Sequence, residues 1–339
     1  MVKPRLKHAA VPLGALLLLL ALLLTLVAGL QTGSMDLSPA EVWAILRGQD
    51  HPQAVIVWDL RLPRLLLGLC SGAVLSLGGF YMQALIKNPL ADPYIMGLTA
   101  GAGLGVNLVV LGLIPLAGLA GFSYPLMAGI GGLSSLALVL ALGWRSLFED
   151  SARLLIAGVA VSSIFTAATG VLIYTQADSD QVRQLVFWSF GSLAKAQWPA
   201  VQVSAALLAV ALLWGWLNAR RLDVLVLGDG TAHSLGLRVL RMKLALLVIT
   251  SLTVGGTVAF TGPIGFVGMM IPHFSRAMFG AAHRPNLLLG SLLGGTYLLA
   301  CDLLGRWLLP PAGLPIGIVT AILGVPFFLY LLLGAGRGL

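Results

Sequence analysis

The stretch Ala84-Leu85-Ile86-Lys87-Asn88-Pro89-Leu90-Ala91-Asp92-Pro93 is a polar turn, broken twice by proline, between two long apolar runs. Lipid offers backbone groups no hydrogen-bond partners, so non-helical backbone at membrane depth must be buried in protein or line an aqueous cavity. We therefore expect a membrane protein whose helices break beside a substrate path or a gate. This pattern favours a transporter over a simple membrane anchor.

The composition around this turn predicts an all-α polytopic membrane protein. The 339 residues are 58% hydrophobic and only 9% charged, whereas a soluble domain normally carries about 25% charged residues. The net charge of +8 does not indicate nucleic-acid binding, because the basic residues are spread through short linkers, as membrane orientation requires.

Apolar runs long enough to cross a bilayer, roughly 20 residues each, predict about ten spans in a single transmembrane domain, 1–339. They lie near 11–30, 62–82, 95–114, 122–143, 153–173, 199–217, 242–262, 264–280, 286–305 and 315–334. The eighth is the shortest and is interrupted. The first run could also be a cleaved signal peptide, but its apolar core of about 18 residues exceeds the usual 7–15, so a retained helix is expected.

The distribution of lysine and arginine predicts the orientation. With the N-terminus in the cytoplasm, 14 of the 20 basic residues fall on the cytoplasmic side and six fall outside. The positive-inside rule therefore places both termini in the cytoplasm. Residues 1–10 are then cytoplasmic, 31–60 form a periplasmic loop, and 218–241 form a cytoplasmic loop.

Two outer segments carry structure of their own. Ser38, Pro39 and Glu41 form a helix start, with Ser38 as N-cap and Glu41 three residues on. A short helix is expected from there through Leu46, outside the membrane. The second segment, 178–198, contains aromatic residues that suit the membrane interface.

Small residues recur at helical spacing. Gly97, Gly101 and Gly105 stand four residues apart on the third span, and two further pairs do the same, Gly68 with Gly72 and Gly290 with Gly294. Small residues at this spacing let helices approach closely. Close packing accounts for them without a ligand site.

Residues able to carry chemistry are few. Cys70 and Cys301 lie inside apolar segments and are interpreted as small core residues. The five histidines lack metal-ligand spacing, so no metal site is expected. Paired aspartates, a serine–histidine set or a metal cluster at membrane depth would mark an intramembrane enzyme, and none is found, so no catalytic residue is predicted.

Charged residues gather at the predicted outer mouth. Asp302 stands four residues before Arg306, and it could act as a proton or substrate relay or as a structural pair at the end of the span. The structural interpretation is favoured, because no second intramembrane acid accompanies it. Arg61 and Arg64 flank Pro63 nearby. These arginines could dock an acidic partner or extend to lipid headgroups, and their chemistry alone leaves both open.

On the inner side, residues 225–237 carry a glycine at each end of a short amphipathic middle, which could press into the groove of a partner protein. No GxxxxGK[ST] sequence occurs, so the chain has no phosphate-binding loop of that type. Transport driven by ATP would need an ATPase on another polypeptide.

In this order and spacing, the motifs resemble the FecCD-type permeases of binding-protein-dependent ABC importers, which take up iron-siderophores, haem and cobalamin. The resemblance runs from about Val57 to Leu333. The blocks that carry it are Arg61-Leu62-Pro63-Arg64, Gln83 with Asn88-Pro89-Leu90-Ala91-Asp92-Pro93, Phe187-Trp188-Ser189-Phe190-Gly191-Ser192-Leu193, Leu227-Gly228 through Leu235-Gly236, Gly265-Phe266-Val267-Gly268 with Pro272-His273 and Arg276, Asp302 with Arg306, and Leu314-Pro315-Ile316-Gly317-Ile318-Val319-Thr320 with Gly324, Pro326 and Phe327.

The resemblance implies a type II importer permease with ten helices per subunit, working as a dimer around a central path in a bacterial or archaeal inner membrane. A chain of this kind more often pairs with itself. The expected partners are a second copy, two cytoplasmic ATPase subunits that bind ATP-Mg, a periplasmic or lipid-anchored substrate-binding protein, and membrane lipid. This chain itself would hold no cofactor.

The resemblance also implies residue roles. The coupling helix seated in the ATPase would lie in 228–237, with Gly228, Asp229, Ala232, Leu235 and Gly236. The arginines that dock the binding protein would be Arg61, Arg64 and Arg306. The inner gate would use Asn88, Leu90 and, less directly, Ser151.

One position departs from the family, because Gly313 stands where an acidic residue usually precedes Leu314. Arg183 could meet an acidic substrate in an outer cavity or simply sit at the interface, and the choice between haem, cobalamin and an iron-siderophore stays open. An ion-coupled secondary transporter is the alternative, since it also uses broken helices. It would need a coupling-ion site, and Asp302 is the only intramembrane acid found for one.

Overall fold

The computed structural model describes residues 4–33, 35–116, 122–143 and 151–335, and within these ranges the regular structure is helical. The elements in chain order are α1 (Pro4–Gln31), α2 (Pro39–Leu46), the π-helical η1 (Ile56–Arg61), α3 (Leu62–Ile86), the 3-10 turn η2 (Pro93–Met96), α4 (Leu98–Val110), α5 (Ser123–Gly143), α7 (Ser151–Gln176), α8 (Ser179–Ser189), α9 (Trp198–Val226), α10 (Asp229–Ser234), α11 (Val239–Thr261), α12 (Val267–Phe279), α13 (His283–Leu308) and α14 (Ile316–Ala335).

The predicted spans all fall on helices, but their number as membrane crossings is not confirmed. Seven helices within the described ranges are long and apolar enough to cross a membrane, and α4 and α14 are shorter apolar helices. The predicted span 264–280 is α12, which has only 13 residues and contains Pro272. The membrane protein and the all-α class are as predicted.

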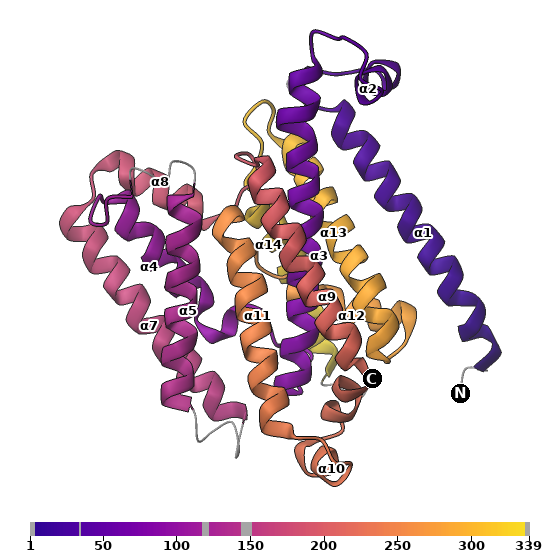
Figure 1. Ribbon diagram of the computed structural model, residues 1–339, viewed down its shortest axis with the longest axis vertical. Helices are drawn as coiled ribbons and strands as arrows, with labels where there is room; N and C mark the ends of the chain where they lie inside the picture. The colour runs from indigo at the N-terminus through magenta and orange to yellow at the C-terminus, as the bar shows by residue number, and fades with distance from the viewer. Residues whose placement is uncertain (1–3, 34, 117–121, 144–150, 336–339) are drawn as a thin grey trace.

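Short helices mark the two ends of the bundle (Figure 1). Helices α2 and α8 lie at one end, and α10 lies at the other, where α1 also begins. We name these the α2 end and the α10 end. The capping box predicted for α2 is present, because the Ser38 N–H donates to Glu41 Oε2 at 2.7 Å and the Glu41 N–H donates to Ser38 Oγ at 3.3 Å.

Helix α3 runs through the middle of the bundle and is buried for nearly its whole length. It crosses α13 where Gly72 faces Gly294, and a Cβ added to either glycine would lie within 2.5 Å of the other's carbonyl oxygen. Gly101 on α4 and Gly131 on α5 approach each other in the same way. The glycine spacing therefore serves close helix packing, as predicted.

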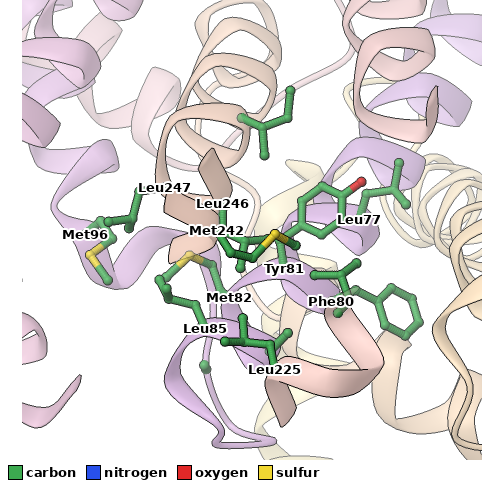
Figure 2. Packing of buried hydrophobic residues seen from close by; sticks show 14 of the residues in the cluster. Leu77, Phe80, Tyr81, Met82, Leu85, Met96, Leu225, Met242, Leu246 and Leu247 are labelled. Atoms are coloured by element: carbon green, nitrogen blue, oxygen red, sulfur yellow. The ribbon is translucent and has the colours of Figure 1, made fainter. Parts of the chain in front are cut away.

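A hydrophobic cluster joins α3 to α9 and α11 toward the α10 end (Figure 2). Tyr81 lies at its centre, with Met82, Leu225 and Met242 around it. The buried Tyr81 hydroxyl donates to the carbonyl of Ala211 at 2.6 Å, so the phenol is satisfied without water. A movement of α9 or α11 at this end should therefore displace α3 as well, because closely packed side chains transmit displacement.

Candidate functional site

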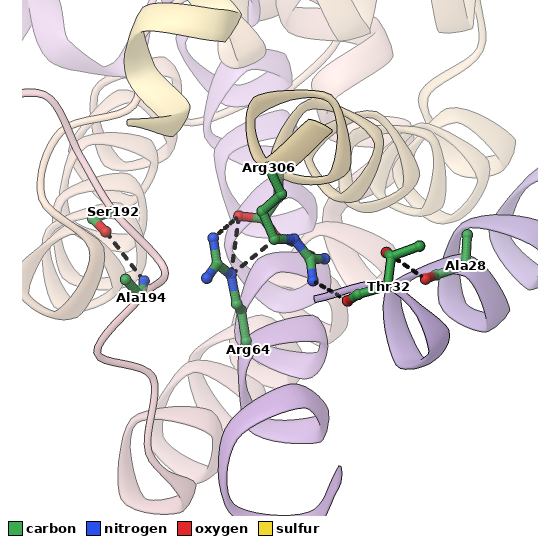
Figure 3. Close-up of polar contacts among 7 residues, drawn as sticks. Ala28, Thr32, Arg64, Ser192, Ala194 and Arg306 are labelled. Atoms are coloured by element: carbon green, nitrogen blue, oxygen red, sulfur yellow. Dashed lines mark hydrogen bonds and ion pairs between the residues drawn. The ribbon is translucent and has the colours of Figure 1, made fainter. Parts of the chain in front are cut away.

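At the α2 end, a buried carboxylate is held between two arginines. Arg64 on α3 donates two hydrogen bonds to the carboxylate of Asp302 on α13. Its Nη2 lies 2.8 Å from Oδ1, and its Nε lies 3.0 Å from Oδ2. Arg306 approaches the same carboxylate, with Nη2 at 3.1 Å from Oδ2. Figure 3 shows Arg64 and Arg306 converging from the two helices. The Asp302 side chain is only 3% exposed, so the pair predicted for Asp302 and Arg306 is a triad, and its geometry is that of a structural clamp.

The other predicted docking arginine, Arg61, turns inward. Its guanidinium donates to the backbone carbonyls of Leu30, Gln31 and Met35, and the residue is only 6% exposed. Carbonyls at the end of a helix lack partners within that helix, so Arg61 caps the end of α1. Arg306 adds a bond to the carbonyl of Thr32 at 3.2 Å. Of the three arginine side chains, Arg64 is the one that keeps substantial access to solvent.

The proline-broken turn after α3 folds back into the bundle. Lys87 ends α3 with a left-handed φ of +56°. Asn88 Oδ1 then accepts from the Leu90 N–H at 2.9 Å, which holds the turn closed on itself, with Asn88 exposed and Leu90 half-buried. Pro93 lies against Gly78, two turns back along α3. The chain therefore re-enters the protein interior, as expected for broken backbone at membrane depth.

This re-entrant turn meets a second break between α11 and α12. The Tyr94 hydroxyl accepts from the Ile264 N–H at 3.0 Å and donates to the Ile264 carbonyl at 3.2 Å. On the other flank, the Gln83 amide donates to the Met269 carbonyl at 3.2 Å and accepts from Arg276. Side chains of Tyr94 and Gln83 thus fasten the two breaks to each other, and they satisfy backbone groups of Ile264 and Met269.

Helix α7 begins at Ser151, the third residue predicted for the inner gate. The side chain of Ser151 lies outside the described part of the chain. The helix itself packs against η2, so α7 and the re-entrant turn are neighbours. The gate role of Asn88, Leu90 and Ser151 stays a prediction.

At the α10 end, the predicted amphipathic segment forms the short helix α10. Its two breaking glycines have positive φ, +112° at Gly228 and +82° at Gly236. Ala232 is buried against the bundle, whereas Leu235 is 63% exposed. The end of this segment, directly after α10, therefore exposes an apolar side chain.

Asp229, the first residue of α10, ties the segment to two long helices. Its Oδ1 lies 2.6 Å from Lys87 Nζ, and its Oδ2 lies 2.6 Å from Lys243 Nζ on α11. The Lys243 side chain is only 3% exposed. Burial opposes ionisation of the Asp229 carboxyl, but the hydrogen bonds and charges of both lysines outweigh it, so its pKa is lowered. Asp229 therefore stays charged near neutral pH.

This bridge joins α10 to the residue that immediately precedes the re-entrant turn. Asp229 belongs to the predicted coupling helix, whereas its partners Lys87 and Lys243 were not predicted from the sequence. Lys87 is 142 residues away from Asp229 in sequence, and no local pattern signals such a contact.

A cavity of about 480 Å³ opens between α4, α5, α8 and α11 near the α2 end, which is the predicted outer end. Aromatic side chains line it together with two cations, and these are Phe122, Tyr124, Phe187, Trp188, Phe260, Arg64 and Lys195. Arg183, predicted for such a cavity, is not among the lining residues. Its side chain is 70% exposed and pairs with Asp180 at 3.0 Å. Gly313, the departure from the family pattern, does line the cavity.

A model of the FecCD transport family matches residues 18–334. The chain belongs to the FecCD transport family. The hemin transport system permease protein HmuU of Yersinia pestis is 41% identical over 337 residues, which cover 98% of this chain and 96% of that relative. The vitamin B12 import system permease protein BtuC of Klebsiella pneumoniae is 39% identical over 325 residues, covering 95% of this chain and 94% of the relative.

A solved structure described as an inward-facing conformation of a metal-chelate type ABC transporter aligns with a TM-score of 0.84. It is 31% identical and covers 95% of this chain and 99% of that chain. The resemblance drawn from the sequence is thereby confirmed. This FecCD protein is a membrane-embedded permease subunit of an ABC importer, with the all-α architecture that the sequence predicted.

Proposed function

We propose that this permease carries a bulky metal chelate inward across the membrane by alternating access, driven by ATP hydrolysis in a partner ATPase. The observation that carries the proposal is the Asp229 bridge, which links α10 to Lys87 at the start of the re-entrant turn. Exposed Leu235 and the breaking glycines suit α10 to a groove on the ATPase. The α10 end is then cytoplasmic, with both termini and residues 218–241 on that side.

The bridge gives a route for ATPase movement. When two ATPase subunits close on ATP-Mg, α10 is displaced with the groove that holds it. Asp229 then pulls on the end of α3 through Lys87 and on the start of α11 through Lys243. Both helices lead into breaks, at 88–93 and at 262–266, and Tyr94 fastens these breaks together. The gate at Asn88 and Leu90 opens or closes as the fastened breaks shift.

At the outer end, we propose that an acidic surface of a periplasmic or lipid-anchored binding protein docks on the arginine clamp. Arg64 makes the direct contact, because its side chain is 25% exposed while Asp302 is 3% exposed. Asp302 and Arg306 hold Arg64 in place, and Arg61 fixes α1 beside them. Charge complementarity of this kind speeds encounter and sets orientation.

The proposed assembly includes a second copy of this chain. Helices α7 and α14 expose large apolar side chains, among them Val171, Tyr174, Leu329 and Leu333. Self-pairing would cover part of that apolar surface and place a path between the two copies, with lipid covering the rest.

The proposed cargo is a large ring-shaped metal chelate. The named relatives transport hemin and vitamin B12, and the outer cavity presents aromatic faces together with Arg64 and Lys195. Aromatic faces suit a flat conjugated ring, and the two cations suit its carboxylate or phosphate substituents. Haem and cobalamin fit this description, and an iron-siderophore is the third candidate.

The test is uptake into proteoliposomes that contain the permease, its ATPase and its binding protein. Radiolabelled haem, cobalamin and an iron-siderophore are supplied separately, with ATP or with a proton or sodium gradient. We expect one cargo to accumulate only with ATP and to stop when the P-loop lysine of the ATPase is replaced. Uptake that follows an ion gradient without ATP would reject the proposal in favour of a secondary transporter. The pairing of Asp302 with two arginines already argues against a coupling-ion site there.

A further inference from the structure

A second pocket, of about 500 Å³, opens at the α10 end between α9 and α11. Its lining is basic and includes Arg221 on α9, together with Arg238 and Arg241 at the start of α11. Trp214 and Asn218 complete the α9 wall. Helices α9, α10 and α11 lie side by side at this end (Figure 1). Gly236 of the coupling segment lines this pocket, but the three arginines have no role in the proposed transport mechanism.

The charges of the pocket are not balanced from within the protein. Arg221 donates to Asn218 Oδ1 at 2.8 Å, which directs one edge of its guanidinium along the pocket wall. Arg238 and Arg241 are exposed, and no carboxylate in the described part of the chain pairs with either of them. The three guanidinium groups around this pocket therefore favour binding of an anion. An arginine side chain can donate two parallel hydrogen bonds to the oxygens of a phosphate.

The surface beyond the pocket is apolar on both helices. On α9, Leu217 and Val210 are 71% and 51% exposed, and they stand four and eleven residues from Arg221 toward the α2 end. On α11, Val248 and Leu252 are each 44% exposed and stand seven and eleven residues from Arg241. These spacings keep each set on one face of its helix.

The length of this apolar surface matches one lipid leaflet. Eleven helical residues span about 16 Å, which is close to half of a hydrocarbon core of about 30 Å. A small anion such as inorganic phosphate would use only the arginines. A ligand that uses both the basic pocket and the apolar stripe must carry a phosphate at one end and acyl chains at the other.

We propose that this pocket binds the headgroup of an anionic phospholipid from the cytoplasmic leaflet, with its acyl chains along Leu217, Val210, Val248 and Leu252. Gly236 and Leu237 line the same pocket, so the bound headgroup braces the turn between α10 and α11. The lipid then holds the end of the coupling segment in place, in addition to the Asp229 bridge at its start. This inference rests on the proposed function for the cytoplasmic position of the α10 end, but it does not depend on which cargo is carried.

The test is native mass spectrometry of the full chain in detergent, titrated with dioleoyl phosphatidylglycerol. Phosphatidylcholine with the same chains, and inorganic phosphate alone, are the comparison ligands. Wild type is compared with R238Q/R241Q and with a control, R220Q/R284Q, that removes the same charge from exposed arginines outside the pocket. We expect R238Q/R241Q to bind phosphatidylglycerol about tenfold more weakly, since each basic residue near an anionic surface contributes appreciably. The control should bind as wild type does.

A second double variant, L217S/L252S, tests the proposal independently if R238Q/R241Q folds poorly. L217S/L252S changes only exposed side chains and should weaken binding of dioleoyl phosphatidylglycerol while leaving dihexanoyl phosphatidylglycerol unaffected. Equal binding of phosphatidylglycerol and phosphatidylcholine, or equal loss in the control, would overturn the proposal. Inorganic phosphate that binds as tightly as the lipid would also overturn it. Loss of ATPase co-purification in R238Q/R241Q with unchanged lipid binding would assign the pocket to the ATPase instead.

Discussion

Asp302 shows how a single buried charge can serve stability in this permease. Its carboxylate is 3% exposed and is held by Arg64 and Arg306, so replacing it with asparagine leaves two guanidinium groups facing each other without a counter-charge. Breaking a buried ion pair costs roughly 3–5 kcal/mol. We expect D302N to lower the free energy of unfolding by about 3 kcal/mol. This value is at the lower end of that range because the Arg64 side chain is partly exposed to solvent.

Denaturant titration in mixed micelles measures that change. The control is D180N, which removes the exposed partner of Arg183 and should cost less than about 1 kcal/mol, since exposed ion pairs contribute little. A D302N protein as stable as D180N would show that the clamp contributes no stability. Reduced affinity for the binding protein in D302N would further support the docking role of Arg64.

The contribution of Asp229 to the free energy of unfolding should depend on pH in a defined way. Its pKa is lowered below the usual 3.8 by Lys243 and Lys87, despite partial burial. A carboxylate with a depressed folded-state pKa contributes stability that is fully present above the unfolded-state value and is lost as the pH falls through the folded-state value. The difference in unfolding free energy between wild type and D229N should therefore be constant from about pH 5 to 8 and should shrink below about pH 4. A difference that changes between about pH 6 and 8 would contradict this assignment.

At the scale of the helices, the contact between α3 and α13 depends on two glycines. A Cβ at position 72 would lie 2.3 Å from the Gly294 carbonyl oxygen, which belongs to rigid backbone. We expect G72A to force the helices apart and to cost at least about 3 kcal/mol, at or beyond the upper end of ordinary overpacking. The measurement is the unfolding titration used for D302N.

Gly129 on α5 gives the matched control. A Cβ added there meets no atom within 4 Å, so G129A should be neutral or should stabilise its helix by up to about 1 kcal/mol. If G72A and G129A behave alike, close approach at Gly72 is not what holds α3 against α13.

The features that sequence could predict are those with local causes. Ser38 and Glu41 are three residues apart, so the α2 cap is visible in the chain, and the proline-broken turn after Lys87 follows from its own residues. The inward turn of Arg61 was not predictable, because it depends on carbonyls some 30 residues earlier in the chain. The Arg64–Asp302 contact joins residues 238 apart, and only the folded packing of α3 against α13 creates it. Sequence thus predicted the helices and the charged ends but not which charges meet.

For the whole molecule, the proposed mechanism is a series of contacts that leads from the ATPase to the re-entrant turn. Helix α10 is fastened through Asp229 to α3 and α11, and these two helices lead into breaks that Tyr94 joins. The hydrophobic cluster around Tyr81 keeps α3, α9 and α11 together while the breaks shift. The chain aligns over nearly its full length with the solved metal-chelate type ABC transporter, so the order and packing of these helices are those of an importer permease.

The ratio of cargo transported to ATP hydrolysed, measured in the reconstituted importer, tests this series of contacts most directly. D229N is compared with wild type and with D223N, which removes a carboxylate on α9 that pairs with His283 at 2.6 Å and, among the described residues, forms no ion pair with α10. We expect D229N still to bind and stimulate the ATPase but to move at least about tenfold less cargo per ATP, while D223N keeps the wild-type ratio. An unchanged ratio in D229N would contradict the claim that Asp229 transmits ATPase movement to the gate.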